Sequence, residues 1–230
     1  MKKTKYEFWI AVNNRPVDEY SHEGDTYIEG RKGSEYTINF RNNFFKPLKV
    51  VFSVDGLNII SGNNDFNKGY VVNPHELLTI PGWLSSNNTA QKFVFSSKDG
   101  SYNMHNKSGD SANIGVIGAM VYDVDNRSEL IPRSALWHDI KEPLILRGVF
   151  CSSDTTAQVF AEQDIGTGYG DETQFNTVTV NKKFLPQPSE ALAIYYDSKK
   201  GLEKRGIILK PVFTKPNPFP GIYCPKPIDK

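Results

Sequence analysis

Cysteine is scarce in this sequence. Cys151 and Cys224 are the only two, far apart along the chain, with no CxxC spacing and no neighbouring histidine. Zinc sites and thiol redox motifs need such spacings, so the sequence argues against both. Whether the two cysteines pair stays open, and the lack of a recognisable secretory signal favours two reduced thiols in a cytosolic folding environment.

An excess of charge of one sign is also missing. The chain has 27 Lys and Arg residues against 26 Asp and Glu residues, a net charge of +1, and the two signs are interspersed. Binders of nucleic acid or of anionic membranes carry a basic surface, so we expect neither partner. The N-terminal stretch MKKTKYEFWIAV has only a short apolar run, broken by Glu7, and we predict neither a signal peptide nor a transmembrane segment.

Motifs for catalysis or metal binding are absent as well. No serine lies in a GxSxG motif, and Asp55 stands between a predicted strand and a glycine, where an aspartate accepts backbone hydrogen bonds in a turn. The run from Asp123 begins like a calcium loop, but Arg127 and Ser128 replace an oxygen ligand and the turn glycine. We therefore predict no catalytic residue, no metal site, no cofactor and no enzymatic activity. The histidines, which have no metal-ligand spacing, are His22, His75, His105 and His138.

What the sequence does contain is a series of short runs that alternate apolar and polar residues and are rich in β-branched and aromatic side chains. This pattern predicts an all-β protein: an antiparallel, jelly-roll-like β-sandwich with a smaller C-terminal β element and at most one or two short helices, the best of them at Asp197–Arg205. The predicted strands are Tyr6–Val12, Thr26–Glu29, Tyr36–Arg41, Leu48–Val54, Lys92–Phe95, Ile114–Tyr122, Leu144–Phe150, Thr177–Val180 and Ala191–Tyr196.

Two glycine-containing stretches mark special positions. Gly166–Gly170 lacks the GxGxxG spacing and no helical pattern follows it, so we expect a loop, and whether it binds a small ligand stays open. Trp83 follows Gly82, a setting more typical of a core residue than of a sugar-binding platform.

The chain divides into four predicted regions. Residues 1–127 form the sandwich, 128–140 a connector, 141–210 a C-terminal β element packed on the sandwich, and 211–230 an extended arm. The arm, PVFTKPNPFPGIYCPKPIDK, has six prolines, a density that excludes a helix or a central strand. Its aromatic residues Phe213, Phe219 and Tyr223 are the candidate partner-binding residues, and the alternative is that the arm wraps its own domain.

An ordered set of motifs resembles a family. EYSHEGDTYIEGRKGSEYTINFRNN, VVFSVDGLNIISG, GYVVNP, IPGWL, FVFS, SY and NIGVIGAMVY, then AEQDIGTGYGDE and ALAIYYDSKKGLEKRGI, are similar to an uncharacterised family of bacteria and tailed phages. The resemblance covers most of residues 18–208. Leu84 stands where family members often have an arginine, so no role of that arginine is carried over.

The resemblance implies a phage virion component by association alone, since no activity is established for the family. Our leading hypothesis is a non-enzymatic structural protein, capsid-decorating or tail-associated, that contacts other virion proteins or copies of itself. The alternative is a carbohydrate- or surface-binding module that uses Trp83, Trp137 and the tyrosines. A third hypothesis is a hydrolase with a site assembled from distant loops around Asp164, Asp171 or His138.

Overall fold

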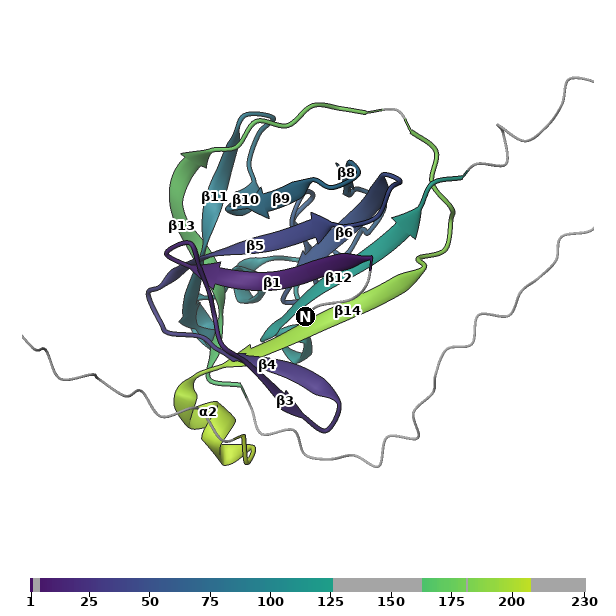
Figure 1. Cartoon of the computed structure of the whole chain (residues 1–230). Helices are drawn as coiled ribbons and strands as arrows, with labels where there is room; N and C mark the ends of the chain where they lie inside the picture. The colour runs from purple at the N-terminus through teal and green to yellow at the C-terminus, as the bar shows by residue number, and fades with distance from the viewer. Residues whose placement is uncertain (2–4, 126–162, 181, 208–230) are drawn as a thin grey trace, which may run out of the picture.

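The computed structural model of the chain describes residues 1, 5–125, 163–180 and 182–207, and these form an all-β sandwich (Figure 1). Two sheets of seven strands each pack face to face. The helices of the described residues are short: α1 (Tyr102–His105), α2 (Lys199–Lys204), and the 3-10 turns η1 (Lys98–Gly100) and η2 (Ser111–Asn113). The predicted fold class is confirmed.

The first sheet has antiparallel pairs throughout its described strands. Its strand order is β10 (Gly82–Leu84), β11 (Thr89–Ser97), β5 (Glu35–Asn42), β1 (Tyr6–Val12) and β2 (Arg15–Pro16), with β13 (Ile165–Gln174) paired to β11 and β9 (Leu77–Ile80) paired to β5.

The second sheet is mixed, because β14 runs parallel to β4 while the other described pairs are antiparallel. Its strand order is β3 (Glu19–His22), β4 (Asp25–Glu29), β14 (Glu190–Asp197), β12 (Val116–Asp123), β6 (Leu48–Val54) and β7 (Leu57–Asn58), with β8 (Tyr70–Val72) paired to β6.

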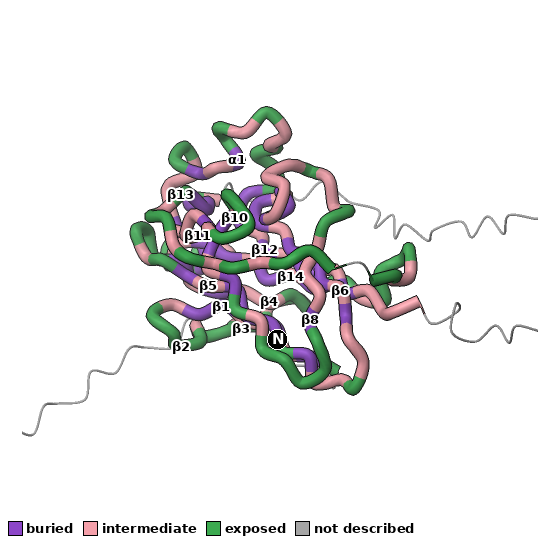
Figure 2. Tube along the Cα trace, turned by 90° about the horizontal axis from the view of Figure 1, so that it is seen from above, coloured by how far each residue is buried: buried purple, intermediate pink, exposed green. Residues whose placement is uncertain are grey.

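The core fills the space between the sheets, and strands such as β1, β11 and β12 alternate buried and less buried residues. In β1, Tyr6, Phe8 and Ile10 are buried, while Glu7 and Trp9 between them are only partly covered. Aromatic rings dominate this core, and Figure 2 shows the buried residues gathered at its centre. Its largest fully buried side chains are Trp83, Tyr36, Tyr196, Phe8, Phe40, Phe52, Phe93 and Phe95.

Several local predictions are confirmed. Strands β1 and β6 have the predicted bounds, and Asp55 and Gly56 close a hairpin with φ of 52° and 78°. Ser198 caps α2 by accepting a hydrogen bond from the Gly201 backbone, and Gly206 ends it at a φ of 78°.

The prediction of a loop at Gly166–Gly170 is wrong, because these residues lie inside β13. Glycines alternate there with buried Thr167, and a Cβ on Gly166 would lie 2.6 Å from the Ser101 Cβ, while one on Gly168 would lie 2.9 Å from the carbonyl oxygen of Gly100. The missing side chains make room for η1 and α1 beside the strand. The predicted strand Thr177–Val180 is also wrong, since these residues are irregular.

The C-terminal part of the described chain contributes one strand to each sheet. β13 pairs with β11 in the first sheet, and β14 lies between β4 and β12 in the second. We predicted an element packed on the sandwich, but alternation alone does not show which strands pair. The strand predicted at Leu144–Phe150, the connector, Cys151, Cys224, and the arm with Phe213, Phe219 and Tyr223 lie outside the described residues.

Candidate functional site

The most distinctive group of polar side chains lies in the core, around Asp55. Its carboxylate accepts hydrogen bonds from the Gly115 and Thr167 backbone amides, both at 2.8 Å, and from the Tyr196 hydroxyl at 2.6 Å. The Thr167 hydroxyl lies 2.7 Å from that of Tyr196 and 2.8 Å from that of Tyr36. Because β5 and β13 belong to one sheet and β14 to the other, this network ties the two sheets together.

Burial raises the pKa of Asp55 to about 6, although the Tyr196 hydroxyl and the backbone amides favour the charged form. Asp55 is fully inaccessible to solvent. A carboxylate with filled acceptor positions and no path to substrate cannot serve as a general base. The predicted turn role of Asp55 is confirmed, but no sequence pattern pointed to its partners Gly115, Thr167 and Tyr196, which lie far from it along the chain.

The residues of the hydrolase hypothesis do not form a site in the described structure. Asp164, just before β13, accepts a hydrogen bond from the Ser198 hydroxyl at 3.2 Å. Asp171 is exposed, seven residues further on, which corresponds to about 23 Å along an extended strand. His138 lies outside the described residues.

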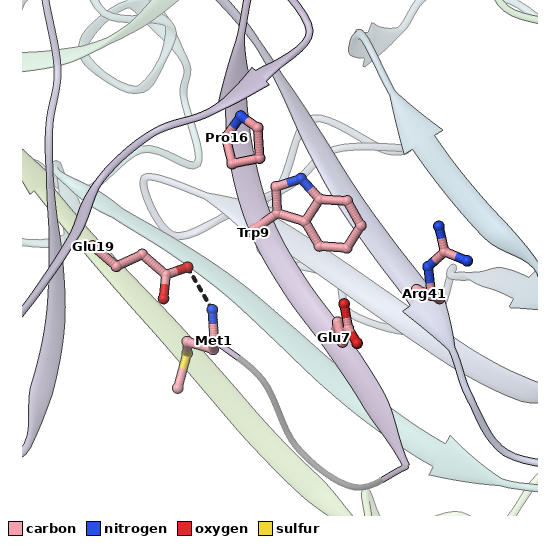
Figure 3. A pocket seen from close by; sticks show the side chains of 6 residues that line it. All are labelled: Met1, Glu7, Trp9, Pro16, Glu19 and Arg41. Atoms are coloured by element: carbon pink, nitrogen blue, oxygen red, sulfur yellow. Dashed lines mark hydrogen bonds and ion pairs between the residues drawn. The ribbon is translucent and has the colours of Figure 1, made fainter.

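An open hollow of about 370 Å³ lies beside β1, on the outer side of the first sheet (Figure 3). We call it the Trp9 groove. Figure 3 shows the indole of Trp9 between Pro16 and Glu7, with Arg41 on one side and Met1 and Glu19 on the other. The groove is lined by Met1, Glu7, Trp9, Pro16, Glu19 and Arg41.

Strand register explains how the Trp9 groove is built. Glu7 is opposite Arg41 and Trp9 is opposite Asn39, so charged and aromatic groups share the outer side of β1 and β5. The Met1 amine donates to Glu19 at 2.5 Å and to the Phe8 carbonyl oxygen at 2.6 Å, which forms one wall. Sequence analysis missed this groove, although the alternation of β1 already places Trp9 on the side opposite the core.

The outer side of the second sheet differs. Tyr20, Tyr27 and Tyr195 lie opposite one another across β3, β4 and β14, and the rings of Tyr27 and Tyr195 stack with centroids 5.4 Å apart. The next rows carry small or apolar residues. We call the set the tyrosine–alanine face; it consists of Tyr20, Tyr27, Tyr195, Val116, Gly118, Ala193, Ser53, Ala191 and Met120.

Trp83 belongs to the core, as predicted, with 2% of its surface exposed. Its indole contacts Tyr102 and Phe93, with ring centroids 4.7 and 5.5 Å away. It therefore cannot join a sugar-binding platform, and Trp137 lies outside the described residues.

No cluster of three or more potential metal ligands occurs within the described ranges. Among these same residues, no helix has the length and apolar character needed to cross a membrane.

In comparisons with known proteins, no family model, no curated protein and no solved structure matches the chain. The family resemblance of its motifs therefore stays a prediction.

Proposed function

We propose that the protein is a non-enzymatic structural protein that acts by contacting other proteins, and that it belongs to a phage particle as a capsid-decorating or tail-associated component. The tyrosine–alanine face carries the first part of this proposal. The second part depends on the resemblance of the motifs to a family found in tailed phages.

The outer side of an antiparallel sheet that faces only water usually carries polar residues. On the tyrosine–alanine face the centre is instead Gly118 and Ala193, flanked by Met120 and the tyrosine row. Tyrosine and methionine are enriched in protein interfaces and charged residues are depleted from their cores. An uncharged centre with an aromatic margin suits a protein partner.

The test is mass spectrometry of purified particles from the phage that encodes the chain. A fixed ratio to the major capsid protein supports the proposal, and a soluble monomer that is absent from particles contradicts it. Ala193→Glu places a charge at the centre of the face and should lower incorporation at least about tenfold. Leu77→Glu is the matched control, because Leu77 is 42% exposed on the other sheet, and it should incorporate normally.

The tyrosine row also favours a second function, carbohydrate binding. Stacked Tyr27 and Tyr195 with Tyr20 beside them provide aromatic faces of the kind that sugar rings contact. A glycan array probed with the full chain tests this function. Binding that Tyr27→Ala abolishes would support it, and an array without signal above background would contradict it.

A further inference from the structure

The Trp9 groove combines an apolar wall with charged groups of both signs at its margin. Trp9 is partly exposed and Pro16 is exposed, so both offer apolar surface to a ligand. Glu7 and Glu19 also line the groove, and Arg41 lies beside Glu7. An open aromatic groove with charged margins is the type of surface that takes extended, proline-rich peptides.

The chain itself contains a peptide of this type. Its last 20 residues hold six of the 14 prolines in the sequence, together with Lys215, Lys226 and Lys230 against a single acidic residue, Asp229. The groove margin carries charges of both signs, Glu7 and Glu19 against Arg41 and the Met1 amine, so the match lies in the apolar groups: Trp9 and Pro16 offer the surface that prolines and Phe219 can cover. We propose that the Trp9 groove is the docking site of residues 211–230 of the same chain.

Proline docking suits the Trp9 groove for two reasons. A polyproline helix repeats every three residues, so Pro216 and Phe219 fall on one side of it and both can contact the Trp9 indole. Such a helix has no internal hydrogen bonds and loses little entropy on binding.

Length permits docking within one molecule. Phe219 is the twelfth residue after Ile207, the last described residue, and twelve residues span about 37 Å when extended. A domain of this size has a radius of gyration of about 15 Å, so the segment can extend about as far as the domain is wide. A tether of this length also gives the segment an effective concentration of about 1 mM. Because copies in solution are more dilute, the chain's own segment is the favoured occupant.

The experiment places p-benzoylphenylalanine at position 219 of the full chain. Isotopically light and heavy copies are mixed at a few micromolar, irradiated and digested, and the cross-linked peptides are identified by mass spectrometry. We expect cross-links from position 219 to the peptide that contains Trp9 or Pro16, in light–light and heavy–heavy pairs only. Mixed light–heavy pairs, cross-links to other regions, or none at all would overturn the inference.

Two controls keep the result tied to the groove. Trp9→Ala should lower the cross-link yield at least about fivefold, whereas Met104→Ala, at an exposed position of α1, should leave it unchanged. A synthetic peptide of residues 211–230, added at several millimolar to the protein that retains Trp9, should compete with the tethered segment and lower the cross-link yield. Failure of the peptide to compete would contradict docking, whether or not the Trp9 variant folds. None of these results depends on the proposed partner of the tyrosine–alanine face.

Discussion

On the outer side of the first sheet Glu7 lies opposite Arg41, whereas the central rows on the outer side of the second sheet carry no charged side chain. Both sides belong to one sandwich with one core, so folding does not require the difference. The charged side is hollowed at Trp9, whereas Gly118 and Ala193 lie at the centre of the uncharged side. This contrast suggests that the two sides bind different things: an extended peptide in the groove and a protein surface on the face.

The largest effect should come from the network that joins the two sheets. Asp55→Ala leaves the Gly115 and Thr167 amides without an acceptor in the core and removes the hydrogen bond from the Tyr196 hydroxyl. We expect a loss of about 3–5 kcal/mol in the free energy of unfolding, measured by urea denaturation, and loss of ligand binding on both outer sides. Asp171→Ala, at an exposed position of β13, is the control and should change stability by less than about 0.5 kcal/mol. Equal effects of the two substitutions would contradict the role of the network.

The same carboxylate should make stability depend on pH. Its pKa rises from 3.8 to about 6 on folding, so the folded state binds the proton more tightly than the unfolded state. The stabilisation from this proton is complete below pH 3.8 and is lost as the pH rises through about 6. Between pH 7 and pH 4 the native protein should gain up to about 3 kcal/mol relative to Asp55→Asn, which cannot titrate. Urea denaturation at several pH values measures the difference, and a constant difference would refute the assignment.

Glycine substitutions compare how tightly the two sheets are packed: Gly166 lies in the first sheet beside η1 and α1, and Gly118 lies on the outer side of the second sheet. A Cβ on Gly166 would lie 2.6 Å from the Ser101 Cβ, which the backbone of α1 holds in place, whereas one on Gly118 would meet chiefly the Ser53 hydroxyl, which can rotate away. Gly166→Ala should therefore cost about 1–3 kcal/mol, and Gly118→Ala less than about 1 kcal/mol. Thermal unfolding of the two variants tests this order. The reverse order would mean that the second sheet is the more tightly covered one.

The alternation of apolar and polar residues was enough to predict the fold class and the bounds of β1 and β6, because a half-buried strand must place every second residue in the core. It failed at Gly166–Gly170, where the deciding factor is the space that η1 and α1 occupy beside β13. Glycine occupies every second position of this stretch. Because every second residue of a strand lies on the same side of the sheet, this spacing was the sequence signal for a strand.

Sites are harder to predict because they depend on pairing. That Asp55 meets Thr167 and Tyr196 follows from β13 and β14 joining different sheets, and no local pattern encodes that choice. The Trp9 groove could be predicted in part. The alternation of β1 places Trp9 on the outer side of the sheet, but its neighbours Arg41 and Glu19 come from other strands, and their pairing cannot be derived from local sequence.

The smallest expected effect concerns the charges of the Trp9 groove. Because Glu7 and Arg41 are direct cross-strand neighbours, a double-mutant cycle with Glu7→Gln and Arg41→Gln should give a coupling of about 0.2–1 kcal/mol. Opposite charges on the surface are screened by salt, so this coupling should fall at 1 M NaCl. The matched pair on the other side, Met120 and Ala191, is uncharged, and its coupling should not weaken with salt. If both couplings respond alike to salt, charge does not distinguish the two sides.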